Sequence, residues 1–234
     1  MNRRLRRRKW PKTRGGDAPK RNGDEAMPEA ATVVETGPDE KTEAIVAAAR
    51  KMFLTLGFDG ASMDQIALTA GVSKRTVYNR FRSKEELFGA AITETCKTFL
   101  PVNVDEIELT LPPDDLVRAL SRQFVKGVLD PEALSLRRIA AFEAGRNPAI
   151  GKMYLERGAE WMVAQCAPIL ERLAKRGFVK IDDAADAIWR LGALITEPLY
   201  TRVLLGDPPA DLDAAIDAQI ENGVEAFKKI YAPE

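Results

Sequence analysis

A cluster of hydrogen-bond donors lies between residues 74 and 80 of this 234-residue sequence. Its members are Lys74, Arg75, Thr76, Tyr78, Asn79 and Arg80. Lys and Arg side chains pair with guanine acceptors, Asn pairs with adenine, and Thr or Tyr contacts thymine methyls and phosphates. If one short helix carries all of these side chains, its outer surface suits the major groove of DNA.

The stretch from Met63 to Phe81, MDQIALTAGVSKRTVYNRF, has the pattern of the helix-turn-helix that such a surface requires. Two short helices that cross steeply need small residues where they touch and at the turn. Ala67 occupies the expected crossing, and Gly71 occupies the turn four positions later. The residues expected to form the small apolar core are Ile66, Val72, Val77 and Phe81.

Helix starts and a further apolar helix flank this motif. Two capping-box patterns, Ser62-Met63-Asp64-Gln65 and Ser83-Lys84-Glu85-Glu86, each predict a helix start. Phosphates favour helix N-termini, so groups near Ser62 and Ser83, together with Lys84, are expected to hold the DNA backbone. Upstream, apolar residues at spacings of three and four predict one helix face that ends at Gly57. Its members are Ile45, Ala49, Met52, Phe53 and Leu56.

The run from Asp39 to about Thr93 resembles the DNA-binding domain of the tetracycline-repressor (TetR/AcrR) family. The resemblance rests on KTEAIVAAARKMFLTLGFDGAS followed by MDQIALTAGVSKRTVYNRFRSKEEL. It implies base contacts, phosphate contacts and a backbone anchor. The matching residues are Lys74, Arg75 and Thr76 for bases, Tyr78, Asn79, Arg80 and Lys84 for phosphates or adjacent bases, and Ser62 for the anchor. One departure is Asn79-Arg80, where family members frequently have an aromatic or histidine pair.

Composition argues against most enzyme classes. Histidine is absent, which removes the commonest general base and metal ligand. Cys96 and Cys166 are 70 positions apart, without a C-x-x-C neighbour, and are expected to be buried thiols. No apolar run approaches the roughly 20 residues of a membrane span. We therefore expect a cytoplasmic, non-enzymatic protein without cofactor or metal.

The charge is unevenly distributed, although its sum is zero. Residues 1–21 hold ten Lys or Arg against Asp17 alone, so the rest of the chain is acidic. Residues 1–38 lack a periodic apolar pattern and are expected to form a disordered tail. Three interpretations of this tail stay open. It is an arm that follows DNA phosphates or enters a minor groove, a solvated extension, or a transit peptide.

Beyond residue 99 the periodicity predicts an all-α chain. A connector precedes expected helices at 113–129, 131–145, 148–175, 182–204 and 208–229. Asp130-Pro131, Asn147-Pro148 and Asp207-Pro208 are taken as helix starts. Pro168 and Pro198 fall inside helical patterns, where each is expected to kink or interrupt its helix. The expected domains are a tail (1–38), a helix-turn-helix domain (39–84) and a sensing and dimerisation domain (85–234).

Aromatic and flexible apolar residues of the second half can line a pocket between helices, although plain core packing explains each of them as well. The candidates are Phe124, Phe142, Tyr154, Trp161, Met162 and Trp189. Candidate polar anchors are Arg157, Glu160, Gln165, Arg190 and Glu197. Family resemblance further implies a homodimer through residues 182–229, by a four-helix interface.

The sequence therefore predicts a DNA-binding transcriptional regulator with an N-terminal three-helix domain and a C-terminal helical bundle. The expected mode is repression relieved by a small molecule that displaces the dimer from an inverted-repeat operator. Two alternatives stay open: an all-α ligand-binding protein or enzyme, and a nonspecific DNA binder that depends on the basic tail. The ligand, the operator and the sign of regulation do not follow from these patterns.

Overall fold

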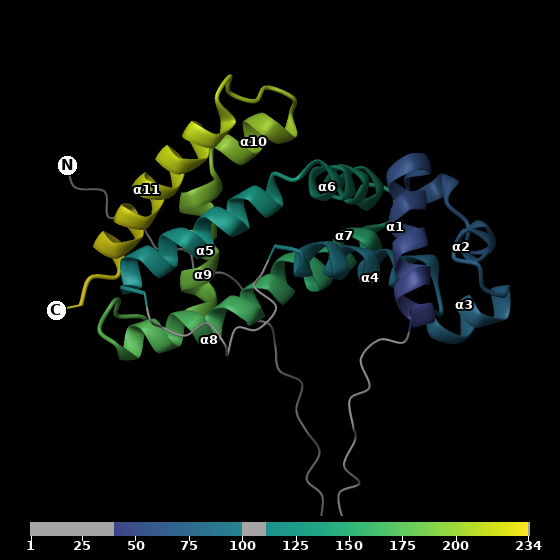
Figure 1. The fold of residues 1–234 in the computed structure, drawn as a ribbon, viewed down its shortest axis with the longest axis horizontal. Helices are drawn as coiled ribbons and strands as arrows, with labels where there is room; N and C mark the ends of the chain where they lie inside the picture. The colour runs from purple at the N-terminus through teal and green to yellow at the C-terminus, as the bar shows by residue number, and fades with distance from the viewer. Residues whose placement is uncertain (1–39, 100–110, 234) are drawn as a thin grey trace, which may run out of the picture. The chain divides into compact units, whose positions relative to one another are not determined.

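The computed structural model describes residues 40–99 and 111–233, and these residues form helices joined by short turns, without a strand in either range (Figure 1). The helices are α1 (Glu40–Gly60), α2 (Met63–Thr69), α3 (Lys74–Arg80), α4 (Lys84–Lys97), α5 (Pro113–Val128), α6 (Pro131–Ala144), α7 (Pro148–Tyr154), α8 (Trp161–Lys175), α9 (Ala184–Thr196), α10 (Leu199–Leu204) and α11 (Leu212–Ile230), with a π-helical turn η1 (Leu155–Glu160) between α7 and α8. The all-α prediction is confirmed. The predicted tail (1–38) and most of the predicted connector lie outside the described residues.

Helices α1 to α4 share one apolar core, to which α6 and α7 add Leu136, Ala140 and Ile150. Its centre is a group of three aromatic rings. The Phe88 ring meets Phe53 edge-on at 5.0 Å between centroids and Phe58 at 5.5 Å. Aromatic pairs in this arrangement add about 0.5–1.5 kcal/mol beyond the burial of their area. The three rings therefore fasten α4 to α1 and to the turn that follows it.

A serine side chain caps the start of each of the three helices that follow α1. The capping patterns at Ser62 and Ser83 predict two of these starts. Ser62, Ser73 and Ser83 each accept a hydrogen bond from the backbone N–H three residues later. Gly57 adopts a φ of 72°, which an L side chain disfavours, and ends the regular run of α1 before a final turn. Leu56 beside it is 46 % exposed, so its predicted place in the apolar face is wrong.

A second core joins α5, α8, α9, α10 and α11. Helices α9 and α11 approach closely because Gly223 has no side chain: a Cβ there would lie 2.6 Å from the Leu194 carbonyl oxygen. Gln219 of α11 donates to the carbonyls of Leu194 and Glu197, at 2.7 Å each. These bonds satisfy acceptors that the end of α9 leaves unpaired.

Three predicted helices differ in detail. The helix predicted at 148–175 contains the turn η1, whereas Pro168 lies inside α8 without ending it. The helix predicted at 182–204 is divided at Pro198, which follows a cis peptide bond. The predicted start at Asp207-Pro208 is wrong, because α11 begins at Leu212 and Asp211 caps it by accepting from the Ala214 N–H.

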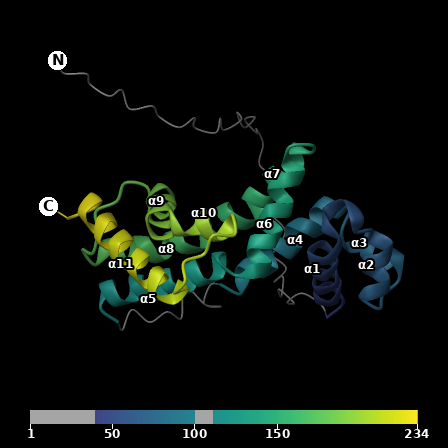
Figure 2. The same ribbon diagram turned by 90° about the horizontal axis from the view of Figure 1, so that it is seen from above.

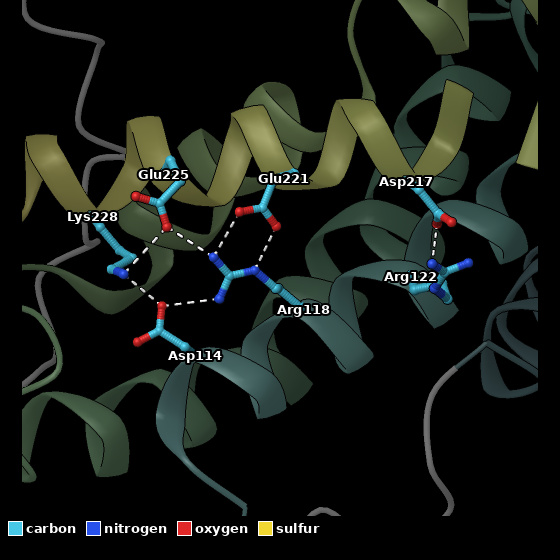
Figure 3. A network of polar contacts seen from close by, with 7 residues as sticks. All are labelled: Asp114, Arg118, Arg122, Asp217, Glu221, Glu225 and Lys228. Carbon is cyan, nitrogen blue, oxygen red and sulfur yellow. Dashed lines mark hydrogen bonds and ion pairs between the residues drawn. The ribbon is translucent and has the colours of Figure 1, made fainter. Parts of the chain in front are cut away.

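Charged side chains connect α5 to α11 along their solvent side (Figure 3). Arg118 donates to both oxygens of Glu221, at 2.7 and 3.0 Å, and to Glu225 at 2.8 Å and Asp114 at 3.0 Å. Lys228 also donates to Asp114. Hydrogen bonds from Lys228 and Arg118 hold the pKa of Asp114 below its ordinary value. We call these residues the α5–α11 ion network.

Replacing Arg118 with Met should lower the free energy of unfolding by about 1–2 kcal/mol at pH 7, because it removes four charge-assisted hydrogen bonds that share one half-buried guanidinium. The effect should shrink in concentrated salt. It should also fade as the pH falls below about 4, where Asp114 and Glu221 take up protons, because hydrogen bonds from Lys228 and Arg118 hold the pKa of these two carboxyls below the ordinary value.

Urea denaturation measures these differences. Arg190→Met is the matched control, since Arg190 makes one exposed pair with Asp186 at 2.7 Å and should contribute less than about 0.5 kcal/mol. Equal losses in the two variants would show that the network adds nothing to a single pair.

Candidate nucleic-acid interface

Helix α3 has one buried and one open face. Val77 is fully buried in the first core, and the side chains around the opposite face, those of Lys74, Arg75, Tyr78 and Asn79, are exposed. The hydroxyls of Ser73 and Thr76 lie 2.7 Å apart, so Thr76 is tied to the start of the helix. A short helix thus presents cationic, phenolic and amide groups to its surroundings.

Two of the basic side chains on α3 are held by neighbouring helices. The Lys74 ammonium donates to Asp64 of α2 at 2.5 Å, and both partners are exposed. The Arg80 guanidinium donates to the Thr42 hydroxyl of α1 at 3.0 Å. These contacts fix the orientation of α3 relative to α1 and α2, and they leave Arg75, Tyr78 and Asn79 as the open part of the face.

Lys84 is directed into the protein. Its ammonium donates to the carbonyls of Phe58 at 2.7 Å and Ala61 at 3.1 Å, and it lies 4.4 Å from the centroid of the Phe58 ring. It therefore closes the turn between α1 and α2. Ser62, at the start of α2, donates to the Gln65 side chain at 2.9 Å and is exposed. The phosphate contacts predicted for Lys84 and Ser62 stay predictions.

A cavity of about 360 Å³ lies in the second half of the chain. Its wall is mostly apolar and comes from α4, α5, α6, η1, α8 and α9, with single residues from α7 and α10. Four of the predicted pocket residues line it: Phe124, Tyr154, Met162 and Trp189. Phe142 and Trp161 do not, because Phe142 points outward, 63 % exposed under Arg146, and Trp161 lies on another side of α8.

The polar residues of the cavity wall were mostly missed from the sequence. Of the predicted anchors, Glu197 lines the cavity and Arg157, Glu160, Gln165 and Arg190 do not. Arg137, Thr95 and Ser121 line it without having been predicted. Their helical positions carry no local mark that separates a cavity-lining polar residue from a solvated one.

Both cysteines line the cavity. Burial raises the pKa of the Cys96 thiol and that of the Cys166 thiol to about 11 each. A thiol in such apolar surroundings stays protonated at neutral pH and reacts slowly. The two cysteines are half-buried, so the expectation of buried thiols is met only in part.

Helix α4 contributes to both regions, and Figure 2 shows it next to α1 and to the pair α6 and α7. Leu87 and Phe88 are buried in the first core, and Ile92 lines the cavity one turn later. The Thr93 hydroxyl donates to the Arg157 carbonyl in η1 at 2.8 Å. A Cβ on Gly158 would lie only 3.2 Å from Ile92, so η1 packs tightly on α4.

Helices α2 and α3 form a helix-turn-helix whose second helix is exposed, and α4 joins it to a helical bundle that contains a cavity. This combination is typical of a class of transcriptional regulators. A sequence profile described as bacterial regulatory proteins, tetR family, matches residues 45–91. Another, described as AefR-like transcriptional repressor, C-terminal domain, matches residues 115–233. The chain belongs to the TetR family of bacterial regulatory proteins, which confirms the resemblance noted in the sequence.

Solved structures agree with this assignment. A putative TetR-family transcriptional regulator from Mesorhizobium loti is 30% identical with a TM-score of 0.68, over 82% of this chain and 97% of that chain. The flavonoid-responsive regulator FrrA is 31% identical with a TM-score of 0.67, over 84% of this chain and 100% of that chain.

Curated relatives are more distant. An uncharacterized HTH-type transcriptional regulator of Mycobacterium bovis is 29% identical over 136 residues, 58% of this chain, and the match spans 63% of that protein's length. An HTH-type transcriptional repressor of Mycobacterium tuberculosis is 27% identical over 180 residues, 77% of this chain and 90% of that protein. None of the helices in the described ranges combines the length and apolarity needed to cross a bilayer.

Replacing Lys84 with Met should destabilise the protein by about 1–2 kcal/mol, because the carbonyls of Phe58, Asp59 and Ala61, at the end of α1 and just after it, lose their charged donor. Thermal unfolding followed by circular dichroism measures the change. Lys97→Met, on the same helix, removes an exposed pair with Glu94 at 3.1 Å and should change stability by less than about 0.5 kcal/mol. A melting temperature of Lys84→Met equal to that of Lys97→Met would contradict a structural role for Lys84.

Proposed function

We propose that the protein is a dimeric, sequence-specific repressor that leaves its operator when a small molecule fills the cavity. The open face of α3 carries the proposal, because its side chains suit base edges and phosphates. The name of the M. tuberculosis relative supports repression as the mode of action. Such a regulator would act in the cytosol, on the genome.

The proposed DNA contacts divide into two kinds. Arg75 and Thr76 near the start of α3, with Lys74, read base edges, whereas Tyr78, Asn79, Arg80, Ser62 and Lys84 hold the backbone or adjacent bases. Arg75 is exposed and suited to the paired acceptors of guanine. Lys84 acts mainly through the fold, since carbonyls already occupy its ammonium.

The proposed dimer uses α9 and α11, within residues 182–229. The exposed side of α11 has small or uncharged residues at a spacing of four: Ala214, Ala218 and Asn222. On α9, Ala185 and Ala193 are exposed at a similar spacing with the larger Trp189 between them, and Trp189 and Ala193 also line the cavity. Small residues permit close helix packing in a four-helix interface. A two-fold dimer would present two α3 helices to major grooves about 34–36 Å apart, on an approximate inverted repeat.

The proposed release depends on α4. A ligand that prefers a displaced arrangement of the cavity wall would shift α4, and with it the separation of the two α3 helices. Only a difference in affinity between the two arrangements drives release, and near-complete switching needs about 5.5 kcal/mol. FrrA is described as flavonoid-responsive. This supports a mostly apolar molecule of similar size as the ligand of this cavity.

Arg75→Ala should weaken operator binding about 5- to 100-fold and relax the preference at one base pair, because a bidentate base contact is lost. Tyr78→Ala should instead weaken binding to all sequences alike. Fluorescence anisotropy on operator DNA selected from genomic fragments, and on its single-base variants, measures both effects. Arg202→Ala, on α10, where the side chain pairs with Asp207, is the control with unchanged affinity. If Arg75→Ala lowers affinity for every base variant equally, Arg75 is a backbone contact.

Ala218→Arg should convert the dimer to a monomer, since it places a charged side chain in the proposed interface. Analytical ultracentrifugation measures the mass, and operator affinity should fall with it. Ala164→Arg on the exposed side of α8 makes the same substitution outside the interface and should remain dimeric. A dimeric Ala218→Arg would place the interface elsewhere.

A further inference from the structure

Arg137 of α6 is the one cationic side chain among the described residues that line the cavity. Its guanidinium carbon lies 4.6 Å from the centroid of the Tyr200 ring, within the range of a cation–π contact. The ring of Tyr200 is buried and fixed, whereas Arg137 itself remains accessible. The aromatic ring thus holds an accessible guanidinium at the cavity wall, where it also hydrogen-bonds to the hydroxyls of Tyr154 and Tyr200.

Two tyrosine hydroxyls accompany this guanidinium. Burial raises the pKa of Tyr154 to about 12, and burial also raises the pKa of Tyr200; the charge of Arg137 acts on both hydroxyls in the opposite direction. Both phenols are therefore protonated at neutral pH and can donate hydrogen bonds. One side of the cavity wall gathers a cation and two phenol donors.

No carboxylate in the described part of the chain forms an ion pair with Arg137. Glu197 is the acidic residue of the cavity wall, but its carboxylate accepts from the Thr201 hydroxyl at 2.7 Å. Nearby Arg138 is directed elsewhere, since it donates to the Leu204 carbonyl at 2.6 Å. The positive charge of Arg137 is therefore not compensated by a protein carboxylate at contact distance.

The rest of the cavity wall is apolar and long. Lining residues on α8 extend from Met162 to Leu173, which corresponds to about 16 Å at the helical rise of 1.5 Å per residue. On α5 they extend from Val117 to Val128. A ligand in this space would displace water from both the apolar wall and the guanidinium. A desolvated cation without a partner is costly, whereas a planar guanidinium pairs strongly with a carboxylate or similar anion.

We propose that the cavity selects amphipathic anions, with a single carboxylate or comparable acidic group bound by Arg137, Tyr154 and Tyr200 and an apolar body along α5 and α8. This inference rests on the proposed function, in that it names the ligand class of the same cavity. Neutral molecules of equal shape bind less tightly, because they leave the guanidinium without an anionic partner.

Two fluorescent probes with the same aromatic body test the selection. 1-Anilinonaphthalene-8-sulfonate carries a negative charge, and N-phenyl-1-naphthylamine lacks the sulfonate. The purified full chain should bind the anionic probe more tightly. Arg137→Gln should weaken the anionic probe by at least about tenfold and change the neutral probe by less than about twofold. Dodecanoate should displace the anionic probe at lower concentration than dodecanol does.

Arg146→Gln is the matched control. Arg146 also stacks on an aromatic ring, that of Phe142 at 4.7 Å, but it lies outside the cavity wall, so both probes should bind as to the unchanged protein. Glu197→Gln removes the acidic group of the wall and should tighten the anionic probe. Near-ultraviolet circular dichroism verifies that each variant keeps its tertiary packing.

The outcomes separate this inference from the proposed function. An unchanged ratio of the two affinities in Arg137→Gln, or an equal loss of both probes, would overturn the selection of anions and leave the cavity as a general ligand site. Failure of both probes and both dodecyl competitors to bind the unchanged protein would overturn the inference together with the ligand-release part of the proposed function. Operator binding, measured on the same samples, tests the DNA-binding part independently.

Discussion

The packing of α4 between two cores is the constraint on which the rest of the molecule depends. Phe88 meets the rings of Phe53 and Phe58 in the first core, and one turn later Ile92 forms part of the cavity wall. A helix of 14 residues is stiff, and packed cores change between discrete arrangements rather than deforming smoothly. The cavity wall and the helix-turn-helix therefore share one stiff element, through which the proposed ligand-induced release would act.

The basic residues near α3 divide between two tasks. Lys74 pairs with Asp64, Arg80 donates to Thr42, and Lys84 closes the turn after α1, so three cations orient the short helices. Arg75 carries the remaining positive charge of α3 on its open face. In the proposed complex Lys74 and Arg80 would have to exchange these protein contacts for DNA contacts, whereas Arg75 is already exposed on the open face.

Much of the fold is predictable because its determinants are local. Ser62 and Ser83 cap helices, and Gly71 supplies the turn with a φ of 67°. The helix start predicted at Asp207-Pro208 is wrong because Asp211, four residues later, has the same capping carboxylate. The contacts along α11 favour the start after Asp211. The contacts of Lys84 and Arg137 could not be predicted from local sequence. Lys84 contacts Phe58, 26 positions away, and Arg137 contacts Tyr200, 63 positions away, so only the fold brings each pair together.

The π-helical turn η1 contains one residue more than regular α-helical bonding would hold between α7 and α8, and such turns often occur at functional sites. Converting it to α-helical bonding would shift the register of one helix against the other by a residue, about 100° of rotation and 1.5 Å of translation. The bond from Thr93 to the Arg157 carbonyl and the close fit of Gly158 on Ile92 depend on the present phase. The hydrogen-bond register of a single turn thus determines which side of α8 faces the cavity while α7 stays fixed on α4.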